Sequence, residues 1–334
     1  MDHRTLPFAL AASFASTVVI LPAPAHAQGA DPQPIVDVMH ALSGMAKHRP
    51  SGAKGQCFVG IFEPTAEARK LSKAATFTKS SPVVGRFSVG GGNSKVADAA
   101  RGPNRGFSFR IDEGGAGHSE FVMINAPINF AKTPQQMLGF LQARVPGADG
   151  KPDANKIKAF TDANPETTNQ GRYLAGKPIA ASWVGSDYYG IHAYTLANAA
   201  DQKSVIKFRM IPTSGLATLT DEEAKAKPAD FLVQELAGRL AAGQPAGFDM
   251  VATLSRPGDH VNDVTRAWAD EETRPTVKLG ALRITALEKN EICDGGFFAP
   301  TTLADGIAGP SPDVDPMFEI RTPAYAISIT KRAN

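Results

Sequence analysis

Short apolar segments bounded by glycine recur along the first half of the chain, and this pattern predicts β-strands. The segments are residues 56–62 (QCFVGIF), 82–89 (PVVGRFSV), 105–111 (RGFSFRI) and 120–126 (EFVMINA). Residues 204–211 (SVIKFRMI) alternate more strictly, with Phe208 and Met210 on one face and Lys207 and Arg209 on the other. This alternation predicts an antiparallel strand with one buried face.

Residues 276–287 (TVKLGALRITAL) form a further predicted strand in which the alternation changes phase. Leu279 has one parity, whereas Leu282 and Ile284 have the other. A β-bulge at Gly280–Ala281 would bring both sets of side chains to the same face.

Three segments have the apolar spacing of amphipathic helices. Thr133, Pro134 and Gln136 are typical of a helix start, and the apolar residues of the following turn recur at helical spacing. Asp153 is a candidate cap for a second helix, and residues 229–242 (ADFLVQELAGRLAA) predict a third that ends before Gly243. Many strands with a few interspersed helices indicate an α+β chain built on an antiparallel barrel or sandwich.

The N-terminus is typical of a secretory signal, not of the folded domain. Arg4 precedes an apolar run over residues 6–21, and Ala25-His26-Ala27 matches the small-x-small pattern of a cleavage site. The alternative, an N-terminal anchor, fits less well because the run is short and interrupted by proline. We therefore expect a signal over residues 1–27, one domain over 28–334, and a periplasmic or secreted protein with no membrane contact after cleavage.

The charge distribution excludes one class of partner. A formal net charge of +2 with scattered Lys and Arg gives no basic stripe of the kind that binds nucleic acid. Cys57 and Cys293 are the two cysteines, and in an oxidising compartment they have the option of pairing, although their spacing leaves this open. Without a second pair or clustered histidines, a structural zinc site is not expected.

Seven short motifs in a fixed order give the chain a resemblance to a known family. They are Ala53-Lys54-Gly55, Arg86-Phe87-Ser88, Arg105-Gly106-Phe107, Asn125-Ala126-Pro127, Tyr189-Gly190-Ile191-His192, Phe298-Ala299-Pro300 with Asp305-Gly306-Ile307, and Arg321-Thr322-Pro323-Ala324-Tyr325. From about Lys47 to Arg332 the chain resembles the haem catalases, and more closely the short exported catalase-related peroxidases. The resemblance implies an eight-stranded antiparallel β-barrel surrounded by helices, with heme b as the cofactor.

The last motif carries the metal assignment. Arg321 and Tyr325 are four residues apart, so on a helix they share one face. A phenol oxygen binds ferric iron as an anion, which a neighbouring guanidinium stabilises. The resemblance implies that Tyr325 is the axial haem iron ligand and that Arg321 bonds to its oxygen; the alternative is an ordinary half-buried helix tyrosine. We expect Pro323 to kink this helix or limit its regularity.

Two further arginines match positions that pair with haem propionates in the family. Arg49 and Arg86 have these roles by resemblance, because guanidinium groups offer a carboxylate two parallel donors. The alternative for each is a surface arginine bonded to solvent.

The position of the family's distal histidine is occupied by Gly52. That histidine moves the peroxide proton to the leaving oxygen, and glycine has no group that does so. Ser88 aligns with a serine that bonds to the far nitrogen of the histidine. His48 is a candidate substitute, although simple exposure to solvent is the favoured interpretation.

Other positions of the distal pocket also depart from the family. The resemblance aligns Ile124 and Asn125 with two adjacent asparagines, which leaves Asn125 as the nearest polar candidate for a catalytic role. Where the family has paired phenylalanines, this chain has Asn129-Phe130. Met137 stands where a phenylalanine of the family stacks on the haem, a contact that a thioether is able to make.

The sequence therefore supports three hypotheses. The first is a haem-dependent peroxidase that acts on hydrogen peroxide or organic peroxides with a small-molecule reductant, and with altered activity. The second is a non-catalytic haem-binding carrier, store or sensor, and the third is a scaffold that has lost haem. Because the chain is short before Lys47 and ends soon after Tyr325, it lacks the arms that lock the tetramers of large catalases, and we expect a monomer or dimer.

Overall fold

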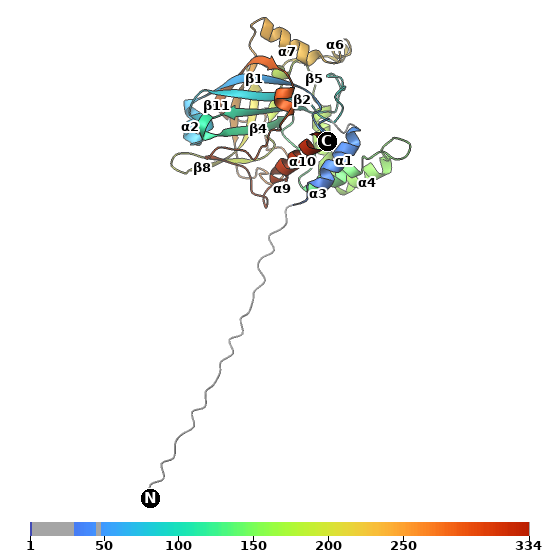
Figure 1. Cartoon of the computed structure of the whole chain (residues 1–334), viewed down its shortest axis with the longest axis horizontal. Coiled ribbons are helices and arrows are strands. Elements are labelled where there is room, and N and C mark those ends of the chain that lie inside the picture. The colour runs from blue at the N-terminus through green and yellow to red at the C-terminus, as the bar shows by residue number, and fades with distance from the viewer. Residues whose placement is uncertain (2–29, 45–47, 334) are drawn as a thin grey trace.

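A computed structural model describes Met1 and residues 30–44 and 48–333 of the 334-residue chain. The predicted signal segment, apart from Met1, lies outside the described residues. Within them, no helix is long and apolar enough to cross a membrane. The described residues form an antiparallel sheet with helices packed around it (Figure 1).

Eight strands close into an antiparallel β-barrel, as the family resemblance implied. In spatial order they are β10 (Gly247–Leu254), β11 (Thr276–Glu288), β1 (Lys54–Pro64), β2 (Ser81–Val89), β3 (Arg105–Asp112), β4 (His118–Ile124), β6 (Tyr188–Tyr189) and β8 (Lys203–Pro212). The barrel closes because β10 pairs with β11 along one edge and with β8 along the other. Strands β7 (Tyr194–Ala197) and β12 (Ile307–Ala308) extend the sheet beyond β8, while β5 (Ile179–Ala180) and β9 (Thr218–Leu219) pair separately.

The barrel interior is filled mainly by aromatic side chains, which come from the inward positions of the predicted strands. The ring centroids of Phe87 and Phe107 are 4.8 Å apart, and that of Phe87 lies 5.2 Å from Trp183. Phe58, Phe109 and Phe121 complete this buried set. Such close ring packing contributes beyond the burial of apolar area. Because inward and outward positions alternate, Ser88 and Ser108 lie on the outer face of the same strands.

The predicted bulge in β11 is real, but its predicted position was wrong. Against β10 the register skips Leu279, and against β1 it skips Thr285. The phase therefore changes one residue before Gly280–Ala281. Gly280 instead serves close packing, because a Cβ there would lie 2.3 Å from the ring of Phe62.

The predicted helices are confirmed. α3 (Pro134–Gln142) starts after Thr133, whose side chain accepts a hydrogen bond from Gln136 N, and α4 (Ala154–Ala163) is capped by Asp153. α7 (Phe231–Ala241) precedes Gly243, which has a positive φ of 64°. The remaining α-helices are α1 (Gln33–Ser43), α2 (Ala66–Leu71), α5 (Asn169–Ala175), α6 (Asp221–Lys225), α8 (Glu291–Asp294), α9 (Pro316–Glu319) and α10 (Arg321–Ala333).

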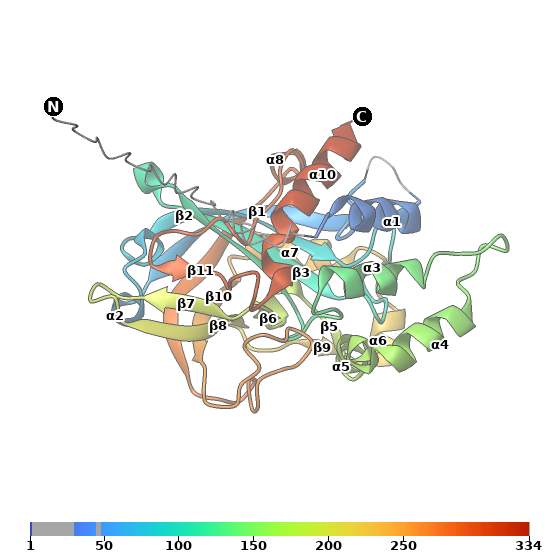
Figure 2. The same ribbon diagram turned by 90° about the horizontal axis from the view of Figure 1, so that it is seen from below.

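Helices α1, α3 and α10 lie together on one side of the barrel, where α1 contacts both of the others (Figures 1 and 2). The expected kink at Pro323 is absent: this residue stands in the first turn of α10, which runs unbroken from Arg321 to Ala333. Proline is tolerated there because the first-turn N–H groups have no partner within the helix.

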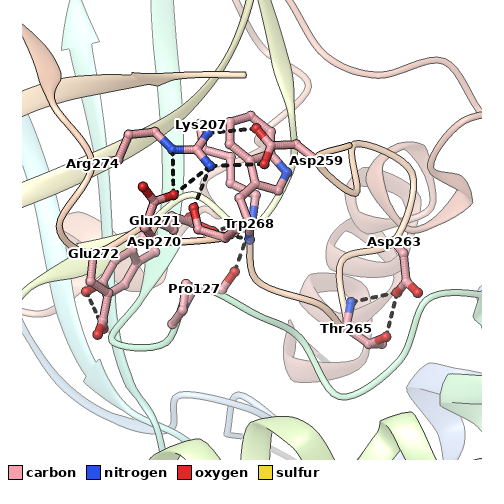
Figure 3. Close-up of polar contacts among 12 residues, drawn as sticks. Pro127, Lys207, Asp259, Asp263, Thr265, Trp268, Asp270, Glu271, Glu272 and Arg274 are labelled. Carbon is pink, nitrogen blue, oxygen red and sulfur yellow. Dashed lines mark hydrogen bonds and ion pairs between the residues drawn. The ribbon is translucent and has the colours of Figure 1, made fainter. Parts of the chain in front are cut away.

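A long loop over residues 255–275 covers the outer face of β8, which the sequence predicted to be solvated. Lys207 is buried beneath it and donates to Glu271 Oε2 at 3.0 Å and to Pro127 O at 3.3 Å (Figure 3). Arg274 holds the loop by bonding to Asp259 through both terminal nitrogens, at 2.7 and 3.0 Å (Figure 3). The loop thereby holds Pro127 in place. From Pro127 the chain continues to residues that line a cavity outside the barrel.

Candidate haem site

A cavity of about 290 Å³ lies between the outer face of β2, β3 and β4 and the helices α1, α3 and α10. We call the surface on the barrel side the barrel wall: Gly52, Ser88, Gly106, Ser108, Val122 and Ile124. The helices contribute Ile35, Val36 and Met39 from α1, Met137 from α3, and Arg321 and Tyr325 from α10. Most of the predicted site residues therefore lie around one space.

Arg321 and Tyr325 meet as their helical spacing predicted. Nε of Arg321 donates to the Tyr325 hydroxyl oxygen at 3.0 Å, and both side chains line the cavity. The phenol oxygen thus faces the cavity with a guanidinium N–H donating to it. The pair therefore has the geometry expected of an anionic oxygen ligand and its supporting cation.

Arg321 is itself held by a buried pair that the sequence did not predict. Its NH1 lies 3.0 Å from His192 Nε2, and His192 Nδ1 lies 2.6 Å from Asp315 Oδ2. His192 and Asp315 are both almost fully buried. Burial lowers the pKa of His192 although Asp315 opposes this, so the ring is neutral. It donates from Nδ1 to Asp315 and accepts from Arg321 at Nε2, which fixes the guanidinium beside Tyr325.

The barrel wall has no acid or base among the described residues that line it. Gly52 adopts a left-handed conformation with φ of 66°, and a Cβ there would lie 3.1 Å from Ser88 Oγ. His48, the candidate substitute for a distal histidine, is exposed and does not line the cavity. Position 52 therefore faces the hydroxyl of Ser88, as expected for a serine that would bond to a histidine there.

The structure does not bring Asn125 to the cavity. Its Oδ1 accepts from Arg105 N at 2.7 Å, and the residue borders a separate small depression near Lys177. Asn129 lines the cavity instead, with Nδ2 donating to Ala131 O at 3.0 Å. The peptide of Asn129 is held by Val264 O of the covering loop at 2.7 Å. An ungapped alignment did not anticipate this because the turn at residues 125–128 carries the chain outward.

Three arginines gather at one end of the cavity around a single carboxylate. Arg49 Nε and Arg86 Nε lie 3.2 and 3.3 Å from Asp294 Oδ1, and Arg332 NH1 donates to Asp294 O at 3.3 Å. All three arginines line the cavity, whereas Asp294 stands behind them. Arg332, two turns beyond Tyr325 on α10, was missed by the sequence analysis, although its seven-residue spacing places it on the face of Tyr325.

This cluster has more positive charge than its carboxylate balances. Burial and the neighbouring Arg49 lower the pKa of Arg86 to about 10, and the same two causes lower the pKa of Arg332. Nε of Arg332 is buried and donates no hydrogen bond, whereas the buried Nε of Arg86 has its ion pair with Asp294. Three guanidinium groups and one carboxylate have a formal net charge of +2, which suits the two propionates of a haem. The unpaired donor is available for one of them.

The other residues assigned by resemblance also border this space. Phe130 and Met137 line it with apolar surface, and the Phe130 ring packs on Phe140 at a centroid distance of 4.5 Å. Among residues 30–44 and 48–333, no group of three or more His, Cys, Asp or Glu side chains is placed to hold a bare metal ion. The cavity thus fits a flat, largely apolar group with two carboxylates and one site for an oxygen ligand.

Comparison with known proteins identifies the class of protein. The family model described as Catalase matches residues 37–333. The chain therefore belongs to the catalase family, and this membership implies a haem.

Within that family, the similar proteins include short peroxidases. A catalase-related peroxidase of Synechococcus elongatus is 34% identical, with 98% of this chain and 96% of the relative covered. One from Mycolicibacterium paratuberculosis is 28% identical, with 91% and 95% covered. A catalase of Schizosaccharomyces pombe is also 28% identical, but the chain covers 56% of its length. These matches support a peroxidase-type oxidoreductase that acts on peroxide.

Solved structures show the same fold. A bacterial catalase aligns with a TM-score of 0.74 over 94% of this chain and 63% of its own, at 23% identity. A fungal catalase aligns with a TM-score of 0.75 over 96% of this chain and 65% of its own, at 22% identity. Both likenesses confirm the barrel and its surrounding helices.

Proposed function

We propose that this protein is a heme b-dependent peroxidase that reduces hydrogen peroxide or an organic peroxide with electrons from a small-molecule donor. The observation that carries the proposal is the Tyr325 hydroxyl, which faces the cavity 3.0 Å from Arg321 Nε. The buried His192–Asp315 pair behind Arg321 supports it, because a structural tyrosine needs no such chain of oriented groups.

The residues that would hold the haem are distributed around the cavity by chemistry. Tyr325 would supply an oxygen ligand to the haem iron, and Arg49, Arg86 and Arg332 would bond to the propionates. Phe130 and Met137 would contact the macrocycle. The bound haem iron supplies the electron transfer that cleavage of the peroxide O–O bond requires.

The chain's own residues favour slow peroxide chemistry. Ser88 and Asn129 offer hydrogen bonds to a peroxide, but neither accepts and returns a proton near neutral pH. Loss of a general acid–base group typically costs about 10²–10⁴ in rate. We therefore expect turnover well below that of an otherwise equal site with a histidine at position 52.

A second candidate function, a haem carrier, store or sensor, is favoured by the same absence of an acid or base among the described residues of the barrel wall. The two functions differ in peroxide consumption. Haem-loaded protein incubated with hydrogen peroxide and an oxidisable dye is expected to consume peroxide steadily above free haem at equal concentration. An unchanged peroxide concentration over hours supports the second candidate.

Haem binding itself is tested by the visible spectrum of protein expressed with haem precursor. We expect a Soret band with high-spin ferric features in the wild type and loss of those features in Tyr325→Phe. Tyr173→Phe is the matched control, because it removes a tyrosine hydroxyl that bonds to Glu272 away from the cavity. A wild-type protein without a Soret band contradicts the proposal and leaves the third hypothesis, a scaffold without haem.

We also propose that the protein is exported and works as a monomer or dimer. The apolar run over residues 6–21 and the motif Ala25-His26-Ala27 support export. The Cys57–Cys293 disulfide suits an oxidising compartment. N-terminal sequencing of protein recovered from the periplasm or medium is expected to start after Ala27, and recovery of an uncleaved cytoplasmic protein would contradict export.

A further inference from the structure

The disulfide between Cys57 and Cys293 joins the barrel to the short helix α8. Cys57 lies on β1 and Cys293 on α8, 236 residues apart in sequence, and both are buried. Asn290, just before α8, adds a second connection: its Oδ1 accepts from Cys57 N at 2.9 Å and its Nδ2 donates to Gly55 O at 3.2 Å. The sequence left this pairing open, and the structure shows it formed.

Helix α8 and the residues just after it carry the acceptors of the arginine cluster. Arg49 NH2 donates to Cys293 O at 2.8 Å and to Gly296 O at 3.0 Å. The Asp294 carboxylate lies against Arg49 and Arg86, and its backbone oxygen accepts from Arg332. Arg49 and Arg332 are thus positioned by residues 293–296, whereas Arg86 also donates to Gly52 O at 2.8 Å and to Ala53 O at 3.2 Å.

This segment follows directly on β11, whose pairing with β1 ends at Cys57 and Glu288, and it packs little beyond that point. α8 has four residues, too few for a stable helix on its own. Its Ile292 is 56% exposed and the side chain of Asp294 is 42% exposed, so packing of these residues contributes little. Repulsion among three guanidinium groups also acts to spread them. Beyond the pairing of β1 with β11, the covalent bond to β1 and the Asn290 contacts therefore restrain α8 further.

We propose that the Cys57–Cys293 disulfide positions the arginine cluster for the carboxylates of the cofactor, so that haem affinity depends on this covalent bond. This inference rests on the proposed haem function. The disulfide touches neither the reacting atoms nor the haem, and acts through α8 on Arg49, Arg86 and Arg332. Without it, the arginines remain in the chain but lose their common orientation.

The test uses the full-length mature protein with Cys57→Ala and Cys293→Ala combined, which leaves no free thiol. Haem affinity is measured by titration and haem release by transfer to apomyoglobin, in parallel with haem dimethyl ester, which lacks the propionate charges. We expect haem affinity to fall about 10- to 100-fold, as for other supporting groups around a bound cofactor. We expect the affinity for the dimethyl ester to stay within about twofold of the wild type, since the ester does not use the arginines.

Two further variants separate positioning from general loss of stability. Leu236→Ala removes core volume under α7, away from the cavity, and is expected to lower thermal stability without changing the preference for haem over its ester. Asn290→Ala keeps the disulfide but removes the second connection, and is expected to weaken haem binding selectively and by a smaller factor. If the double cysteine variant does not fold, Asn290→Ala decides the matter.

The outcomes are distinct from failure of the haem proposal. A wild type that binds neither haem nor its ester contradicts the proposed function. A wild type that binds haem, with variants that bind it equally well or lose haem and ester to the same degree, overturns the positioning role while leaving haem binding intact.

Discussion

Replacement of Gly52 by histidine is the sharpest test of the barrel wall. We expect Gly52→His to raise kcat/KM for hydrogen peroxide by about 10²–10⁴, because a general acid–base group returns to the cavity. At about 1.36 kcal/mol per tenfold, this equals roughly 2.7–5.4 kcal/mol of transition-state stabilisation. Ser88 Oγ, 3.1 Å from the position of the new Cβ, is placed to orient the imidazole.

The same substitution carries a cost in folding stability. A left-handed residue with a side chain costs about 1–2 kcal/mol relative to glycine, and Gly52 has φ of 66°. Histidine is among the residues that tolerate this conformation best. The contacts at 3.1 and 3.2 Å to Ser88 are tight but involve a side chain that is able to turn. Since domains of this kind are stable by about 5–15 kcal/mol, the variant is expected to fold.

The assay compares haem-normalised steady-state rates and thermal unfolding for the wild type, Gly52→His and Gly52→Ala. The alanine variant has the backbone strain without the imidazole, so we expect it to lose stability and gain no rate. Adding Ser88→Ala to the histidine variant is expected to reduce the gain, because the ring loses its hydrogen-bond partner. A folded, haem-loaded histidine variant with the wild-type rate would refute the assignment of position 52 to the reaction site.

Three other expectations concern buried charge and oligomeric state. Burial holds the pKa of His192 below its usual 6.5, so in acid the unfolded state binds more protons than the folded state. The free energy of unfolding should therefore decline as pH falls below about 6.5, by at most about 1.4 kcal/mol per pH unit. Denaturant titrations in which the wild type has the same pH dependence of stability as His192→Gln would contradict this. Lys207→Met is expected to destabilise the fold by about 3–5 kcal/mol because it leaves Glu271 buried without its partner. The double variant Lys207→Met with Glu271→Leu should restore much of this loss. Equal unfolding midpoints for the wild type and both variants would exclude the ion pair as a restraint on the loop. Size-exclusion chromatography with light scattering should give a monomer or dimer, and a tetramer would contradict that proposal.

Local pattern was enough to predict the strands whose residues alternate and the helices with clear starts. The strict alternation of residues 204–211 correctly placed Phe208 and Met210 in the core. It was wrong about Lys207, because a loop some fifty residues later covers the outer face of β8. Burial by a distant loop leaves no mark on the periodicity of the strand beneath it. The bulge in β11 was predicted one residue late for a related reason, since its register depends on two partner strands.

In the candidate site, too, relations within one helix were predictable and contacts between separate segments were not. Arg321 and Tyr325 were predictable because four residues on a helix fix their relation. His192 reaches Arg321 from a loop 129 residues earlier, and Asp315, which caps α9 just before α10, meets Arg321 only through His192, so spacing gave no indication of this pair. Asn125 shows the reverse error, because alignment by resemblance gave it a role in the cavity, whereas its side chain accepts from Arg105 N outside the cavity. The disulfide was undecidable until three-dimensional structure brought β1 and α8 together.

The placement of the cavity outside the barrel separates two kinds of evolutionary constraint. Inward residues of β2 and β3, such as Phe87 and Phe107, form the core on which folding depends. Their outward neighbours Ser88 and Ser108 line the cavity. Single substitutions at outward strand positions are therefore able to change the chemistry of the cavity while the aromatic interior stays unchanged. A selection that randomises only the outward positions should yield many folded variants with different reactivities.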